Sequence, residues 1–355
     1  MSFGFYLLLT FHFLFMGTTL LNTVTLSEMT DLIRKQFVMV QQMVKPMAGQ
    51  LFIKDPIGKG QGSTKRYDEV DTATFARRKR QGEASKKAAV GVGYNVTAEK
   101  KRIALEIDIT QEMRDENRYA EVGSLITSLT HFCPQRIELD QTHVLTFCSA
   151  TSYTDMDGDT NTITVGDGLA LASTVHTLKF SSSTYSNRVT GDPIFSRGGL
   201  EAAEALGTTQ ILSNFGERRV MSFNAIITGD DPNTVNTVKQ FLNSTADVDA
   251  AQAGVINVYR GKYRHIVLPY LATTATGARD STKERIWFLG AIGQGTNGWQ
   301  AYYSVWEEPH MKDQSTDDRG ANHDYSRDIW TFGTRAGYSV RAVSGRGLIA
   351  SLPTS

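Results

Sequence analysis

Histidine, serine and cysteine side chains, which often carry catalysis or bind metals, occur in this sequence without the spacing that such sites need. The seven histidines form no H-x-x-x-H or H-x-H pair, and no G-x-S-x-G motif exposes a nucleophilic serine. Two cysteines are too few for a structural zinc site or a disulfide framework. The sequence therefore argues against an enzyme and predicts no metal and no cofactor.

Two short motifs resemble ligand-binding loops, but each has its residues at the wrong positions. The run Asp155, Asp157 and Asp159 resembles a calcium loop, yet its glycine, Gly158, stands at loop position four, where the calcium loop needs it at six. The stretch 58–65, GKGQGSTK, lacks both the G-K-[ST] order and the strand-to-helix context of a phosphate loop. We expect a polar turn in the first case and no phosphate site in the second.

The two cysteines, Cys133 and Cys148, lie in a stretch that reads as helical. Fifteen residues of helix separate them by about 22 Å along the axis, so they cannot pair with each other. The default compartment for such a chain is a reducing cytoplasm.

The beginning of the chain, residues 3–16, is strongly apolar. It lacks a preceding Lys or Arg and an A-x-A cleavage site, and it is too short to span a bilayer comfortably. A weak export signal, a buried N-terminal segment, or an extension (residues 1–15) upstream of a true start at Met16 would each account for it. We favour the extension.

Length and charge limit the remaining possibilities. A chain of 355 residues corresponds to about two domains, and 40% apolar with 21% charged residues is typical of a globular protein. Because 37 basic residues balance 37 acidic ones, the chain as a whole has no field that would attract a charged partner from a distance. Any electrostatic interaction must therefore be regional.

The region 54–87 is one such charged segment. It carries ten Lys or Arg against five Asp or Glu, with scattered glycines and little apolar periodicity. A strand follows at once, because Ile103, Leu105, Ile107 and Ile109 alternate with polar or small residues. A structureless loop of this length is uncommon, so the pattern predicts an exposed, long β-hairpin arm.

From residue 117 to 147 the apolar period changes to that of a helix, with Pro134 in the middle, where we expect a kink or a break. Beyond residue 149 the pattern favours strands, with helices at 199–206 and 232–243. The class is α+β. Strands are expected at 220–228, 255–259, 266–271, 286–289, 302–306, 328–332, 338–343 and 347–351.

One stretch resembles a known family. Residues 165–178, VGDGLALASTVHTL, are followed by Tyr185, Ser186 and Asn187, and then by GGLEAAEA at 198–205. They resemble the D-G … L-F-S … H … S-N … L-x-x-A signature of tailed-bacteriophage major capsid proteins of the HK97-like fold. The order of segments is also similar to that of the family, from about Thr18 to the end of the chain.

The resemblance implies a domain organisation. It assigns an N-terminal arm to residues 1–50, an extended β-hairpin E-loop to 51–102, a peripheral domain with a long spine helix to 103–150 and 305–355, and an axial A domain to 151–304.

The resemblance also implies function and partners. The chain would assemble with itself into hexamers and pentamers of an icosahedral shell that encloses double-stranded DNA without reading its sequence. Portal, scaffold or decoration proteins would be further partners, and no membrane would be involved. Assembly would take place in the host cytoplasm and the product would be the virion. Some family members crosslink an E-loop lysine to a neighbour's asparagine; Lys59, Lys65 and Lys79 lie in that region, but no catalytic acid is marked beside them.

Charge suggests how neighbouring subunits would meet. Residues 307–328 carry seven acidic residues against three basic ones, nearly the reverse of the surplus of five positive charges at 54–87. An intersubunit contact is therefore predicted, with two independently solvated loops as the alternative. Its residues are Arg77, Arg78, Lys79 and Arg80 on one side and Glu307, Glu308, Asp317 and Asp318 on the other.

Two other functions fit parts of the sequence. An encapsulin-type cellular shell protein has the same fold but is generally shorter. A secreted β-rich binding protein or hydrolase is suggested by the apolar start and by Trp287, Trp299, Trp306 and Trp330, although tryptophans on strands more often belong to a core than to a carbohydrate platform.

Overall fold

The computed structural model of the chain describes residues 35, 38, 46–58, 60–72, 75–87, 90–116, 118–246, 256–295, 298–312, 323–324 and 329–354. These residues belong to two compact units. One contains Lys101–Arg136 and Glu307–Gly337, and the other contains Pro46–Lys100, Ile137–Trp306 and Tyr338–Ser355.

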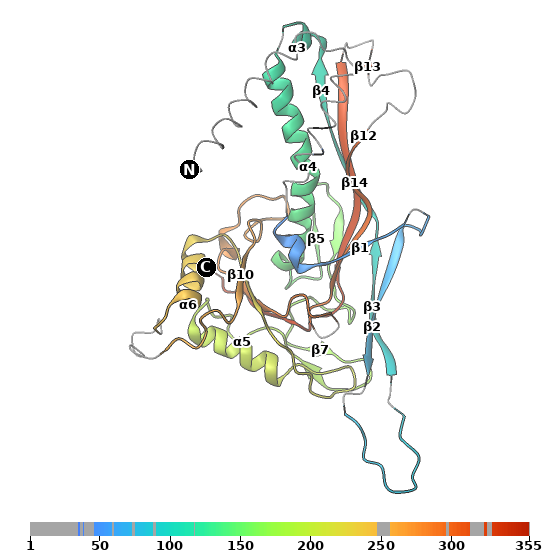
Figure 1. The fold of residues 1–355 in the computed structure, drawn as a ribbon, viewed down its shortest axis with the longest axis vertical. Coiled ribbons are helices and arrows are strands. Elements are labelled where there is room, and N and C mark those ends of the chain that lie inside the picture. The colour runs from blue at the N-terminus through green and yellow to red at the C-terminus, as the bar shows by residue number, and fades with distance from the viewer. Residues whose placement is uncertain are drawn as a thin grey trace, which may run out of the picture. The chain divides into compact units, whose positions relative to one another are not determined.

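Helices and strands are mixed along the chain, which confirms the α+β class (Figure 1). The helices are η2 (Ala48–Leu51), α3 (Gln111–Asp115), α4 (Tyr119–Thr146), α5 (Arg197–Thr209), α6 (Pro232–Asn243) and η4 (Ser281–Lys283). The strands are β1 (Ile53–Pro56), β2 (Thr64–Thr72), β3 (Val90–Glu99), β4 (Lys101–Thr110), β5 (Ser152–Thr154), β6 (Thr160–Thr162), β7 (His176–Thr177), β8 (Thr184–Tyr185), β9 (Ala225–Thr228), β10 (Arg264–Val267), β11 (Trp287–Gly290), β12 (Ala301–Lys312), β13 (His323–Asp324), β14 (Ile329–Ala342) and β15 (Leu348–Ser351).

The first unit has a small core between α4 and the sheet that contains β4 and β14. Ile109 of β4 packs with Val122, Ile126 and Leu129 of α4 and with Phe332 of β14. The helix expected at 117–147 is confirmed, and it continues through Pro134 without a break.

The expected burial of the whole apolar face of β4 is wrong for Leu105, which is 49% exposed. Ile107 is partly buried and Ile109 fully buried, so only the end of the strand nearest α3 is covered. Alternation reports which face of a strand is apolar, but not how far a helix extends over it.

Truncation of Leu129 tests this core. Because its side chain is fully buried, Leu129→Ala is expected to lower the free energy of unfolding by about 2–5 kcal/mol. Thr127 lies on the opposite face of the expected helix, but it is half-buried, so the exposed Ser128→Ala is the control and should be nearly silent. Urea denaturation measures both, and equal losses would contradict the packing described.

The second unit is built around the sheet β10-β9-β11-β15. Strands β9 and β10 are parallel, whereas β11 is antiparallel to β9 and β15. Alternate residues enter two different cores: Ile227 and Phe288 enter one, and Ile226 and Trp287 enter the other, which also receives α5 and α6. Burial on both faces explains why these strands are continuous apolar runs.

Several strand predictions need correction. The strand expected at 220–228 begins only at Ala225, and that at 266–271 lies at 264–267 instead. No regular strand forms at the described residues of 255–259, where Ile256 makes a single bridge to Ala246. Turns at 257–262 and 268–271 satisfy the backbone of these residues instead.

The C-terminal strands are longer than the pattern indicates. Residues 329–332 and 338–342 of the two expected strands belong to one strand, β14, which pairs with the long strand β12. Residues 333–337, GTRAG, have little strand propensity of their own. An ion pair of 2.5 Å between Arg335 of β14 and Glu307 of β12 contributes to this pairing.

Strands β2 and β3 form the predicted hairpin, pairing antiparallel from Thr64 with Glu99 to Thr72 with Val90 (Figure 1). We call β2, β3 and their connection the arm, and residues 75–87 the arm loop. Every residue of the arm loop is exposed. The strands, however, are not exposed as expected, because Tyr67, Glu69 and Asp71 of β2 are each at most 8% exposed.

The remaining predictions from the sequence concern the cysteines, the tryptophans and a possible membrane segment. Both cysteines are free and buried, and burial raises the pKa of the Cys148 thiol to about 12, which makes it unreactive. Trp287 and Trp299 are buried and therefore do not present a face to a sugar. None of the helices described is both long enough and apolar enough to span a bilayer. The first 15 residues lie outside the described residues.

Candidate functional site

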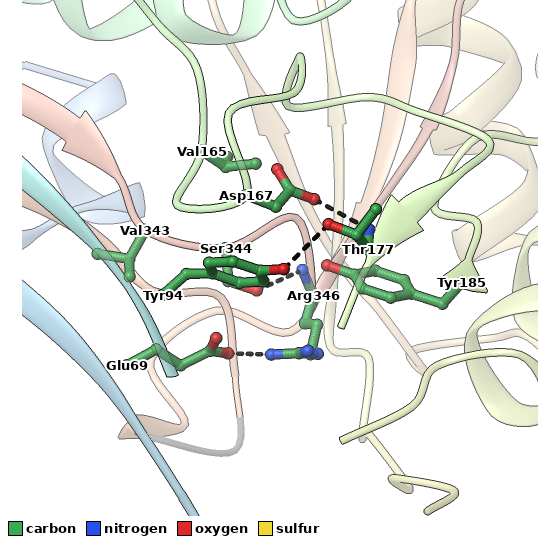
Figure 2. A pocket seen from close by; sticks show the side chains of 9 residues that line it. All are labelled: Glu69, Tyr94, Val165, Asp167, Thr177, Tyr185, Val343, Ser344 and Arg346. Atoms are coloured by element: carbon green, nitrogen blue, oxygen red, sulfur yellow. Dashed lines mark hydrogen bonds and ion pairs between the residues drawn. The ribbon is translucent and has the colours of Figure 1, made fainter. Parts of the chain in front are cut away.

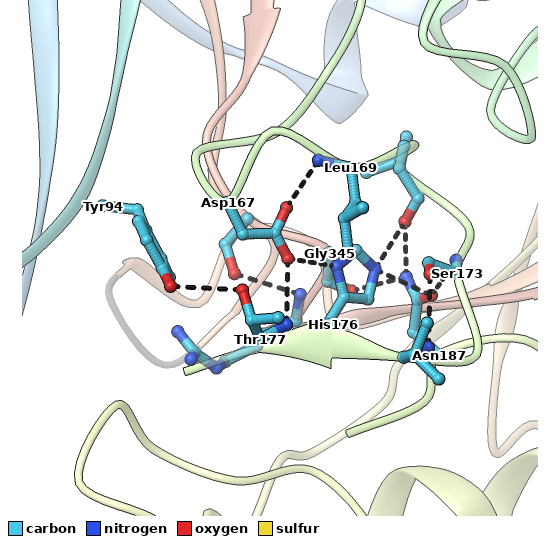
Figure 3. A network of polar contacts seen from close by, with 12 residues as sticks. Tyr94, Asp167, Leu169, Ser173, His176, Thr177, Asn187 and Gly345 are labelled. Atoms are coloured by element: carbon cyan, nitrogen blue, oxygen red, sulfur yellow. Dashed lines mark hydrogen bonds and ion pairs between the residues drawn. The ribbon is translucent and has the colours of Figure 1, made fainter. Parts of the chain in front are cut away.

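The signature residues Asp167, His176 and Asn187 meet in one buried polar network (Figure 3). Asp167 lies in a tight turn, where its carboxylate accepts a hydrogen bond from the backbone N–H of Leu169 at 3.0 Å. His176 begins β7 and Asn187 follows β8, and these two short strands pair antiparallel. The turn and the small ribbon together bring the three side chains into contact.

Oxygen acceptors hold the His176 ring on both sides. Its Nδ1 lies 2.7 Å from Asp167 Oδ2, and its Nε2 lies 3.2 Å from both Leu171 O and Asn187 Oδ1. Burial opposes ionisation of Asp167, but the hydrogen bond and positive charge of His176, with two backbone N–H groups, lower the Asp167 pKa overall. Both ring nitrogens of His176 therefore face oxygen acceptors, and the Asp167 carboxylate is held by donors within the buried network.

Asn187 connects this network to the C-terminal segment. Its Nδ2 donates to Leu171 O at 2.7 Å, Gly345 O at 3.0 Å and Leu348 O at 3.2 Å. A Cβ on Gly345 would lie 2.7 Å from His176 Nε2, so only glycine allows this close approach. The network thereby determines where the backbone around residue 346 runs.

Arg346 uses that position to hold the arm (Figure 2). Its guanidinium forms an ion pair with Glu69 of β2, and the two side chains are 3% and 5% exposed. Arg346 also donates from Nε to Leu212 O at 2.7 Å and from Nη2 to Asn214 Oδ1 at 3.1 Å. Asn214 Nδ2 donates to the other Glu69 oxygen at 2.9 Å, which closes the cluster.

Tyr185 lies between the two clusters. Its ring stacks on His176 with centroids 4.8 Å apart, and the Arg346 guanidinium lies 5.1 Å from its centroid. Burial raises the pKa of Tyr185 to about 12, so the phenol is neutral at physiological pH. A neutral ring with a polarised face is suited to pack against the cationic guanidinium of Arg346.

Strand β3 is held as well. Lys179 Nζ donates to Gly93 O at 2.7 Å, and the hydroxyls of Tyr94 and Thr177 are 3.1 Å apart (Figure 3). A Cβ on Gly93 would lie 2.6 Å from Asn214 Nδ2, so glycine is needed there for β3 to lie close to the Asn214 side chain.

A further contact fixes the arm near the start of β2. The Tyr67 hydroxyl bonds to the Asp55 carboxylate and lies 2.6 Å from Ser304 Oγ, while its ring stacks on Tyr302 at 4.1 Å. Burial and the Asp55 carboxylate raise the pKa of Tyr67 well above its usual range. Both strands of the arm are therefore anchored, and the arm loop is the part that projects.

The pocket at this network is small and polar (Figure 2). Its cavity volume of about 10 Å³ has room for no more than about one water molecule and is far below the roughly 300–1,000 Å³ typical of ligand sites. Among the described residues, no group of three His, Cys, Asp or Glu is arranged to hold a metal ion. The arrangement is suited to positioning backbone segments. The pocket is lined by Glu69, Tyr94, Val165, Asp167, Thr177, Tyr185, Val343, Ser344 and Arg346.

The basic residues proposed for the intersubunit contact, Arg77, Arg78, Lys79 and Arg80, are all exposed on the arm loop. The one ion pair described for them within the chain is loose, with Arg77 Nη2 3.9 Å from Glu217 Oε1.

The acidic side of that contact is only partly described. Glu307 is paired with Arg335 of its own chain, and Glu308 is exposed. Asp317 and Asp318 lie outside the described residues.

The Asp155 loop is a polar turn, as expected. Asp155 Oδ1 accepts from the backbone N–H groups of Asp157 and Asp159 at 3.0 Å each, and Oδ2 accepts from Asn161 Nδ2 at 2.8 Å. The carboxylate that a cation would need is therefore used within the loop.

Sequence reasoning missed the residues that hold the arm: Glu69, Asn214 and Arg346. One weak signal was available, because Tyr67, Glu69 and Asp71 alternate along β2 and so share a face. Acidic residues on a strand normally face solvent, so that spacing favoured the opposite interpretation.

Comparisons with known proteins complete the description. No family model and no curated protein matches the sequence. Among solved structures, the chain is similar to one from Microbacterium phage Oxtober96, with 10% identity, a TM-score of 0.46 and 86% of this chain and 90% of that chain covered. It is similar to the capsid structure of the cyanophage P-SCSP1u, with 10% identity, a TM-score of 0.46 and coverage of 84% and 85%. A virus-like particle from Pyrococcus furiosus shares 11% identity, with a TM-score of 0.45 and coverage of 90% and 97%.

Proposed function

We propose that the chain is the major capsid protein of a tailed bacteriophage, with the HK97-like fold. One observation carries the proposal. The signature residues Asp167, His176 and Asn187 form a single buried network, and this network positions the segment that holds a two-stranded arm with a fully exposed basic loop.

An arm of this kind is useful only with a partner. Each residue of the arm loop is exposed, including Phe75, whose side chain is 61% exposed. In a single subunit such a loop has no role, whereas in a shell it can lie across the neighbouring subunit. We propose that the chain assembles into hexamers and pentamers of an icosahedral shell around double-stranded DNA.

The proposal includes the domain organisation of that family. Residues 51–102 would be the E-loop, 103–150 and 305–355 the peripheral domain, 151–304 the axial domain, and residues 1–50 the N-terminal arm. The subunit would act without catalysis or cofactor, assemble in the host cytoplasm with portal, scaffold or decoration proteins as partners, and end in the virion.

Electron microscopy tests the proposal directly. The purified full chain, concentrated and stained, is expected to give rings or closed particles of uniform diameter. A monomer at every concentration and salt condition, measured by light scattering as well as microscopy, would contradict it.

Proteolysis gives an independent prediction. In the unassembled chain, trypsin is expected to cut first between Arg77 and Arg80, because these four basic residues lie outside any strand and are exposed. In particles, cleavage there is expected to slow by roughly tenfold or more, because the loop must leave its neighbour before it is cut. Fragment masses against time measure both rates, and equal rates would mean that the loop stays free in the assembly.

A further inference from the structure

We propose that the buried pair of Arg346 and Glu69 is a positioning joint, which sets the direction of the arm before a neighbouring subunit binds. The inference rests on the proposed shell function, because direction matters only if the arm must reach a partner.

The buried pair is better suited to fix the orientation of β2 than to add to the stability of the fold. Two opposite charges are taken out of water almost completely, at side-chain exposures of 3% and 5%. Burial of an ion pair often contributes no more stability than an apolar pair of similar volume. A planar guanidinium that is bonded at the same time to Glu69, Leu212 and Asn214, however, accepts only one orientation of the strand that carries the carboxylate.

The backbone on either side of Arg346 is held in a fixed position. Asn187 holds the carbonyl groups on either side of Arg346, those of Gly345 and Leu348. Gly347 has a positive φ of 79°, and a Cβ there would lie 2.5 Å from the backbone N of Trp299. The segment therefore has little freedom to move, and the signature residues act on the arm through it.

The pair of Arg346 and Glu69 also lies close to the end of β2, beyond which the arm loop is exposed. Asp71, two residues beyond Glu69, accepts a bond from Asn214 N at 2.8 Å, and the exposed arm loop follows shortly after. A segment of eight residues, the number that separates Thr72 from Arg80, can reach at most about 25 Å, so a rotation of about 10° at the joint would displace its end by up to about 4 Å. That displacement exceeds a hydrogen-bond length, so a loose joint would misplace the loop on a neighbour.

The test compares Arg346→Met with a matched control on β2, the strand that carries Glu69. The exposed ion pair of Arg66 and Asp68, 2.6 Å long, lies on the opposite face of β2, and Arg66→Met removes it. Hydrogen exchange of backbone amides is measured in the unassembled full chain. Exchange in β2 and β3 is expected to rise at least tenfold in Arg346→Met and to stay unchanged in Arg66→Met, while exchange in α6 rises clearly less than in β2 and β3 in Arg346→Met and stays unchanged in Arg66→Met.

A double variant separates direction from folding. Arg346→Met leaves the Glu69 carboxylate buried without its partner, which by itself destabilises the fold. In Glu69→Leu with Arg346→Met no lone charge is buried, so the unfolding midpoint is expected to return to near the wild-type value. Assembly, followed by light scattering, is expected to remain at least tenfold slower than in the wild type.

The outcomes are distinct. Two results would contradict the proposal that the pair positions the arm. One is assembly of the double variant at the wild-type rate, and the other is unchanged exchange in β2 and β3 of Arg346→Met. An increase in α6 as large as that in β2 and β3 also contradicts the proposal, because the pair would then only support the fold. If the wild-type chain forms no particles, the shell function fails, while the exchange result still decides whether the pair orders the arm.

Discussion

Asp167→Ala is expected to lower the free energy of unfolding by about 3–5 kcal/mol, one of the largest effects of any single substitution in this chain. The reason is that His176, whose ring is fully buried, would lose the carboxylate at 2.7 Å to which its Nδ1 is hydrogen-bonded. Asp159→Ala, in the exposed turn between β5 and β6, is the control and should be nearly silent. Thermal or urea denaturation measures both.

The effect should depend on pH in a defined direction. The folded-state pKa of Asp167 lies below the ordinary 3.8, so the stability that it contributes is present above that pH and is lost as the pH falls through the folded-state pKa. The difference between wild type and Asp167→Asn should therefore shrink as the pH falls below about 4. A difference that grows on acidification would mean that the network does not hold an ionised carboxylate.

Reversal of the arm-loop charges is expected to have the largest effect on assembly. Replacement of Arg77, Arg78 and Arg80 by Glu should abolish shell formation at low salt, because the loop would then meet the acidic segment 307–328 of a neighbour with like charge. Each exposed pair contributes only about 0–1 kcal/mol, so the effect comes from several pairs acting together at every contact. Light scattering follows the assembly.

Compensating substitutions test whether the arm loop contacts the acidic segment 307–328 of a neighbouring subunit. Asp317→Lys with Asp318→Lys, added to the charge-reversed arm loop, should restore part of the lost assembly. Wild-type assembly should also slow between 0.1 and 1 M salt, because the Debye length falls from about 10 Å to about 3 Å. If the added lysines restore nothing, the arm loop binds elsewhere. Glu307 is already paired with Arg335, so Glu307→Gln should matter less than changes at the two aspartates.

Local patterns in the sequence determined much of the fold. Alternation at 103–109, the helical period at 117–147 and the capped helix at 232–243 are confirmed because each depends on neighbours in the chain. The length of β14 could not be predicted, because residues 333–337 form a strand only through pairing in the sheet. The lack of a regular strand among the described residues 256–259 could not be predicted either, because turns form their backbone hydrogen bonds in place of a partner strand.

The candidate site divides in the same way. The resemblance to a family came from the stretch that contains Asp167, His176 and Asn187 together with the order of segments along the chain, and the basic arm loop was visible from composition alone. That Arg346 holds Glu69, 277 positions away, is decided only by the tertiary structure. A charged residue on a strand is expected to face solvent, and only the position of its partner, brought close by the folding of distant segments, makes burial of the pair possible.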